Sequence, residues 1–158
     1  MNTKKSLAVA QYMLDRCRKA GYNAITPQLL IKLVYVAHGY MLGKHGQPLL
    51  GESVKAWRHG PVVASVYGAI RCFGGNAVEN VPGAQRGYVF SAEERQAMDH
   101  VAMAYGKYSG VTLSAATHHP NTPWSMTWTA IGRNCVLSND LIRHFYERIV
   151  KTPAHSAL

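Results

Sequence analysis

Two groups of polar side chains in the first half of the chain have the residue types that bind anions. In the segment AWRHGPV, residues 56–62, Arg58 and His59 stand directly before Gly60-Pro61. Glycine followed by proline is typical of a helix start, where unpaired backbone amides attract a carboxylate or phosphate. The sequence therefore predicts an anion-binding helix start here. The structural alternative makes Trp57 a core anchor and Arg58 part of a local structural pair.

The second group lies on a helix that we expect to be buried. Lys32, Tyr35, His38 and Gly39 fall within an arc of about 120° when successive residues turn by about 100°. The rest of this helix is apolar, and buried polar groups need hydrogen-bond partners. The stripe therefore either pairs with other parts of the fold, such as the loop around His118, or lines a cleft.

Motifs for catalysis, metal binding and nucleotide binding are absent from the sequence. It lacks H-E-x-x-H, C-x-x-C, G-x-S-x-G, G-x-G-x-x-G and the P-loop pattern. The adjacent pair His118-His119 is poorly arranged for one ion, and Cys17 and Cys72 are expected on apolar helix faces, where thiols are inert. We predict no catalytic residue, metal or cofactor. A hydrolase that uses His118 or His59 would need a pocket with a nucleophile or metal beside them.

The elements that position these residues are mostly helices. The apolar periodicity and caps predict helices over residues 4–20, 26–42, 60–73, 91–105, 111–117 and 138–150, with short strands within 49–57, 87–90 and 135–137. Thr26-Pro27 caps the most apolar helix, and Ser91 with Glu94 forms a capping box. The fold class expected is mainly α (α+β): one compact domain of about six helices with a small antiparallel sheet at most.

Composition and charge narrow the class of protein. A chain of 158 residues with 47% hydrophobic and 16% charged residues has room for one ordinary folded domain and is not a disordered segment. Its net charge is +9, and residues 1–78 hold ten basic and two acidic residues, a net charge of +8. Any electropositive surface should therefore come mainly from the first half, unless the bases are scattered over several faces. Such a surface attracts nucleic acid, an acidic membrane or an acidic protein.

The cysteines and the apolar segments predict a cytoplasmic protein that has no membrane partner. Cys17, Cys72 and Cys135 are far apart and odd in number, which is typical of small core residues in a reduced protein. The first residues lack the uninterrupted apolar core of a signal peptide. The longest apolar stretch, residues 29–42, is interrupted by Lys32 and is too short to cross a bilayer.

The order of several motifs along the chain is typical of one protein family. KLVYVAHG begins at Lys32, GQPL precedes AWRHGPV, and Val66-Tyr67 follows. Downstream, LSAATH ends at His118, and Pro123-Trp124 comes after it. Over most of its length the chain resembles the Panacea domain of SocA-like antitoxins, a family that also includes GepA-type phage-associated proteins.

The resemblance implies domain boundaries and a set of signature positions. It predicts a Panacea domain over residues 1–150 and a flexible C-terminal tail over 151–158. It supplies no catalytic residue. The signature or partner-binding positions that it implies are Lys32, Tyr35, His38, Trp57, Arg58, His59, Gly60, Pro61, Tyr67, Thr117, His118 and Trp124.

The resemblance also implies a function. It predicts a non-enzymatic antitoxin that neutralises a cognate toxin from an adjacent gene by direct binding, with the basic half facing an acidic toxin surface. One family role is an adaptor that delivers the toxin to a ClpXP-type protease, for which residues 151–158 are the candidate tether. The alternative is a nucleic-acid-binding regulator, favoured by the net charge of +9 and by the pairs Tyr12/Arg16 and Trp57/Arg58.

The sequence also bears on operator binding and on the oligomeric state. The pattern shows no helix-turn-helix segment beside the domain, so direct operator binding is not expected. The apolar stripe of residues 142–150 is compatible with packing inward in a monomer or onto a second copy in a homodimer.

Overall fold

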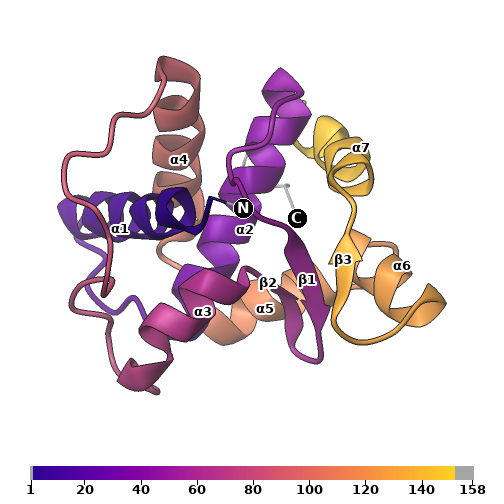
Figure 1. Cartoon of the computed structure of the whole chain (residues 1–158), viewed down its shortest axis with the longest axis horizontal. Helices are drawn as coiled ribbons and strands as arrows, with labels where there is room; N and C mark the ends of the chain where they lie inside the picture. Colours follow the sequence, from indigo (N-terminus) through magenta and orange to yellow (C-terminus); the bar gives the residue numbers. More distant parts are fainter. Residues whose placement is uncertain (1, 152–158) are drawn as a thin grey trace.

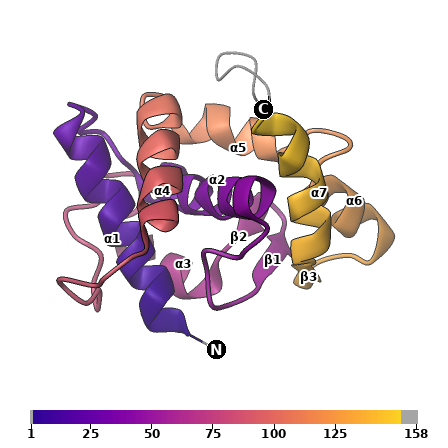
Figure 2. The same ribbon diagram turned by 90° about the horizontal axis from the view of Figure 1, so that it is seen from above.

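Helix α2 (Pro27–His45) is the centre of the fold. The computed structural model describes residues 2–151, and every residue from 29 to 42 is buried. The Thr26 side chain accepts a hydrogen bond from the amide of Leu29, and Gly46 ends the helix in the left-handed conformation. Figures 1 and 2 show α2 between α1 (Thr3–Lys19) and α4 (Ala92–Tyr105) on one side and α6 (Pro123–Ala130) and α7 (Asn139–Ile149) on the other. The expected buried central helix is confirmed.

The other helices surround α2, and two of them begin at the serine caps that the sequence indicates. Their bounds are α1 (Thr3–Lys19), α3 (Ala64–Ile70) with a 3-10 turn (Arg71–Phe73), α4 (Ala92–Tyr105), α5 (Gly110–His118), α6 (Pro123–Ala130) and α7 (Asn139–Ile149). The capping box between Ser91 and Glu94 is present, and Ser138 caps α7. The fold is mainly α with a small antiparallel sheet, as expected.

Helix α6 is the element that the sequence analysis missed. The prolines of His119-Pro120 and Thr122-Pro123 indicated only an irregular loop. In the structure Pro123 occupies the first turn of α6, where it costs no hydrogen bond, and the Thr122 side chain accepts from the amide of Ser125. The second proline therefore starts a helix instead of preventing one.

Three short strands form the sheet, in the order β2-β1-β3 (Figure 1). Strand β1 (Val54–Trp57) pairs antiparallel with β2 (Gly60–Val62) and with β3 (Cys135–Leu137). The predicted helix start at Gly60-Pro61 is wrong. Gly60 has a φ of 119°, which closes the turn after β1, and Pro61 is tolerated because β2 is an edge strand.

Two smaller predictions are also wrong. Residues 87–90 form no strand; they lie in a loop that ends at Phe90, whose ring packs edge-on against Tyr12 at 5.5 Å. Cys72 is exposed, because α3 ends at Ile70 and the 3-10 turn carries this residue away from the core. Cys17 is buried as expected, and burial raises the pKa of its thiol to about 11.

The apolar stripe of α7 packs inward. Ile142 and Tyr146 are buried, and Phe145 and Ile149 are partly buried against the same core. The stripe therefore belongs to the hydrophobic core of this chain. Within residues 2–151, no helix is long and apolar enough to cross a membrane.

Charges from the two halves of the chain meet between α1 and α4. Lys5 pairs with Glu94, and Arg16 donates from Nε to Asp99 at 3.1 Å. Two bases of the strongly basic first half are thus compensated by acids of the second half. The number of basic residues in the first half therefore overstates the positive charge that the surface offers to an anion.

Candidate functional site

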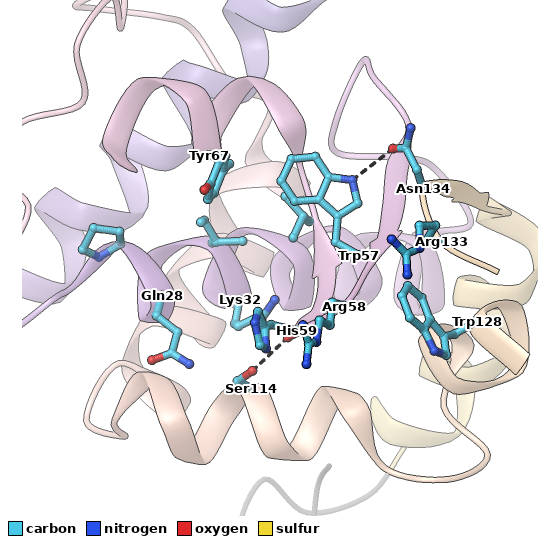
Figure 3. Close-up of a pocket in the computed structure, with 13 residues that line it drawn as sticks. Gln28, Lys32, Trp57, Arg58, His59, Tyr67, Ser114, Trp128, Arg133 and Asn134 are labelled. Atoms are coloured by element: carbon cyan, nitrogen blue, oxygen red, sulfur yellow. Dashed lines mark hydrogen bonds between the residues drawn. The ribbon is translucent and has the colours of Figure 1, made fainter. Parts of the chain in front are cut away.

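A cavity of about 830 Å³ lies where α2, the sheet, α3, α5 and α6 meet (Figure 3). We call it the Trp57 pocket. It is lined by Pro27, Gln28, Ile31, Lys32, Trp57, Arg58, His59, Val62, Tyr67, Ser114, Trp128, Arg133 and Asn134. Three of these side chains are those of lysine or arginine, and none is acidic. The pocket therefore combines apolar walls with positive charge.

Lys32 places an ammonium group on the inner wall of the pocket. Its side chain is only 3% exposed, and its Nζ donates a hydrogen bond of 2.8 Å to the carbonyl of Pro61. None of the salt bridges found within residues 2–151 includes it. Burial disfavours the charged form and lowers the pKa of Lys32 to about 8.

Helix α5 holds the β1–β2 turn at the rim of the pocket. The Ser114 hydroxyl donates to the carbonyl of His59 at 3.0 Å, and His118 Nε2 donates to the carbonyl of Arg58 at 3.1 Å. These bonds engage the backbone of the turn, so the exposed side chains of Arg58 and His59 are presented from a fixed position. Thr117 bonds within α5, through its hydroxyl to the carbonyls of Leu113 and Ser114.

Aromatic rings form the apolar part of the wall. The indole of Trp57 donates to Asn134 Oδ1 at 3.1 Å and packs edge-on against Tyr67 at 5.1 Å between ring centroids. Trp124 donates to the carbonyl of Trp57 at 2.6 Å and stacks on Trp128 at 5.3 Å. Trp57, Tyr67 and Trp128 line the wall (Figure 3). Trp124 does not line it but contacts two of these residues, Trp57 and Trp128.

The polar stripe of α2 divides between two environments. Lys32 lines the pocket, whereas His38 lies against α7. His38 Nδ1 accepts from the amides of Leu49 and Leu50, at 3.3 and 3.2 Å, and Nε2 donates to Asn139 Oδ1 at 2.9 Å. This arrangement requires the neutral ring, and burial lowers the pKa of His38 to about 4.

Tyr35 and Gly39, like His38, lie against α7 and do not line the pocket. The rings of Tyr35 and Tyr146 are both buried and meet edge-on at 6.0 Å, and Gly39 faces the same Tyr146 ring. Both alternatives for the stripe therefore hold: one residue lines a cleft, and three pack within the fold.

The structure adds Trp128, Arg133 and Asn134 to the pocket, which the sequence analysis did not single out. Trp128 belongs to the missed helix α6. Asn134 adopts a left-handed conformation with a φ of 59°, and its amide donates to the carbonyl of Ala56. The turn-forming residues Gly132-Arg133-Asn134 were the available signal for a chain reversal at this point.

Replacing Lys32 by methionine is expected to raise the free energy of unfolding at pH 7 by about 1–2 kcal/mol, because it removes the cost of a buried charge. In the wild type, the folded protein releases this proton near pH 8 and the unfolded chain near pH 10.5. Stability should therefore rise across this window, by up to about 3 kcal/mol, and the Lys32→Met variant should lack that rise.

Urea denaturation of both proteins from pH 7 to 10 measures this effect. Burial also raises the pKa of Tyr35 and Tyr146, which opposes the rise above pH 10 in both proteins, so the difference between them is the relevant quantity. A difference that does not change with pH would show that Lys32 is hydrated in the folded state.

Comparison with known proteins relates this site to a family. The family model described as "Antitoxin SocA-like, Panacea domain" matches residues 30–125, which include Lys32 and the segment 56–62. The Antitoxin SocA of Caulobacter vibrioides (strain NA1000 / CB15N) is 29% identical over 139 residues, which cover 80% of this chain and 72% of that protein. No solved structure matches the chain. The chain belongs to the SocA-like antitoxin family and contains its Panacea domain.

Proposed function

We propose that the protein is an antitoxin that neutralises a cognate toxin, encoded by an adjacent gene, by direct protein–protein binding. The observation that carries the proposal is that Lys32 and the segment 56–62, which are far apart in the sequence and both within the family match, meet at one pocket. Family membership supports the antitoxin role. The proposed site of action is the cytoplasm. The three unpaired cysteines of the chain support this proposal.

The proposed contact surface is the rim of the Trp57 pocket. Arg58, His59, Tyr67 and Arg133 are exposed there, and no acidic residue lines the pocket. An acidic toxin surface would complement this charge. Neutralisation by contact requires no chemistry from the antitoxin, and the Ser114 hydroxyl is engaged by the carbonyl of His59 rather than by a base.

A charge reversal tests this surface. Arg58→Glu is expected to weaken toxin binding by about tenfold or more, because it removes a positive charge and adds a like charge facing the toxin. Arg71→Glu is the matched control: it makes the same charge change at an exposed residue that does not line the pocket. Rescue of growth on co-expression with the adjacent gene, followed by pull-down of its product, is the measurement.

The outcomes of this assay are distinct. If the adjacent gene is harmless alone, or stays toxic beside the wild-type protein, the antitoxin proposal fails. If both variants rescue equally, the antitoxin role stands and the rim is not the contact. An adaptor for a ClpXP-type protease would lower the level of the toxin, whereas simple sequestration would leave toxin bound to the antitoxin. Of the candidate tether, residues 151–158, only Lys151 is among the described residues.

A nucleic-acid-binding regulator is the second candidate. Trp57 and Arg58 favour this function, because an aromatic ring and an exposed, positively charged side chain lie together at the pocket. The other proposed pair does not, because Tyr12 and Arg16 both donate to Asp99. Binding of DNA or RNA that weakens steeply with salt would support this function, and absence of binding at low salt would exclude it.

A further inference from the structure

The Trp57 pocket holds a positive charge that the described part of the chain does not compensate. An ammonium group has three N–H donors, and the one hydrogen bond found for Lys32 within residues 2–151 goes to the carbonyl of Pro61. The other polar side chains of the lining carry hydroxyl, amide, imidazole, indole or guanidinium groups, and none carries a carboxylate. Two N–H groups thus remain for a ligand.

The rest of the pocket offers apolar surface that suits an aromatic group. Ile31, Val62, Trp57, Tyr67 and Trp128 contribute aliphatic and aromatic surface (Figure 3). Hydrogen bonds and ring contacts fix the Trp57 ring, and stacking on Trp124 fixes that of Trp128. A cavity of about 830 Å³ is within the range of pockets that bind small organic molecules.

We propose that the Trp57 pocket binds a small organic anion with a flat aromatic body and a single carboxylate, which accepts hydrogen bonds from the ammonium of Lys32. The inference goes beyond the antitoxin role and does not depend on it. It assigns to this chain a ligand site in addition to a partner surface.

The charge balance favours a monoanion. One carboxylate has two oxygens for the two remaining N–H donors of Lys32, and it leaves the buried pair neutral. A phosphate dianion would leave an excess negative charge in the inner part of the pocket, since Arg58 and Arg133 lie at its exposed rim. The cost of burying the ammonium is met on folding, and the lowered pKa of Lys32 is the sign of that cost. A bound carboxylate therefore gains a charge interaction with the ammonium of Lys32, and this ammonium does not have to be desolvated again on binding.

A matched pair of probes tests the carboxylate requirement on the purified wild-type protein. Indole-3-acetate carries the aromatic body and the carboxylate, and indole-3-acetamide has the same shape without the charge. We expect calorimetric titration to show indole-3-acetate binding about tenfold or more tightly than the amide, as for a hydrogen bond to a charged group.

Two lysine variants on the same helix test the position. Lys32→Met should lower affinity for indole-3-acetate to that for the amide, whereas Lys44→Met, which alters an exposed lysine in the last turn of α2, should bind as the wild type does. Equal binding of acid and amide, unchanged binding by Lys32→Met, or no binding at millimolar concentration would overturn the proposal. Tighter binding of adenosine monophosphate than of indole-3-acetate would overturn the choice of a carboxylate. The comparison of acid and amide uses the wild type, so it stands even if a variant does not fold.

Discussion

Replacing His38 by alanine is expected to lower the free energy of unfolding by about 3–5 kcal/mol, because it combines a cavity with lost buried hydrogen bonds. The ring is completely buried and bonds to the amides of Leu49 and Leu50 and to Asn139. Without it, two amides and one side-chain oxygen lose their partner. Urea denaturation at pH 7 measures the loss. His119→Ala, at an exposed histidine, is the control and should change stability little.

The same residue should make the protein sensitive to acid. Its pKa is about 4 in the folded protein, against 6.5 in an ordinary histidine, so the unfolded chain binds the proton first as the pH falls. Stability should therefore fall from about pH 6.5 down to about pH 4, by up to roughly 3 kcal/mol. The slope between pH 6.5 and 5 is the most specific part, because carboxylates such as Glu94 titrate lower. Equal slopes for the wild type and His38→Ala would show that another group is responsible.

The sequence predicted the elements whose local signals agree with their packing. Thr26-Pro27 and the apolar run that follows favour one buried helix, and α2 starts there, although it continues past the predicted end at residue 42 to His45. At Gly60-Pro61 the local signal was ambiguous. The same dipeptide suits a helix start and a tight turn into an edge strand, and pairing with β1 decides for the strand. At this position the pairing of two strands, and not the local sequence pattern, determines the structure.

The candidate site was predicted in parts but not as a whole. Lys32 and the segment 56–62 were both singled out, yet nothing in their spacing indicates that Lys32 contacts Pro61. Trp128 reaches the pocket from helix α6, which the prolines at residues 120 and 123 made hard to predict, and Arg133 reaches it from the turn after this helix. His118 was considered for acid–base chemistry, whereas its ring holds the carbonyl of Arg58. Such a role depends on tertiary geometry that residue type alone does not reveal.

The close approach of α2 and α7 is a further feature that depends on residues without side chains. A Cβ atom on Gly39 would lie 2.4 Å from the ring of Tyr146, and one on Gly43 would lie 2.6 Å from the backbone carbonyl carbon of Tyr146. A ring can adjust, but the backbone of a packed helix moves only as a whole. Gly43 therefore allows the close approach of α7, and α7 carries the Asn139 that bonds to His38.

Gly43→Ala is accordingly expected to lower the free energy of unfolding by about 3 kcal/mol or more, since overpacking forces the two helices apart. Gly68→Ala is the matched control, because a Cβ atom on this residue of α3 would meet nothing within 4 Å. There the same substitution should stabilise the protein by about 0.5–1 kcal/mol through helix propensity. Urea denaturation of the two variants should thus give changes of opposite sign. Two stabilising substitutions would mean that α7 lies farther from α2 than this structure has it.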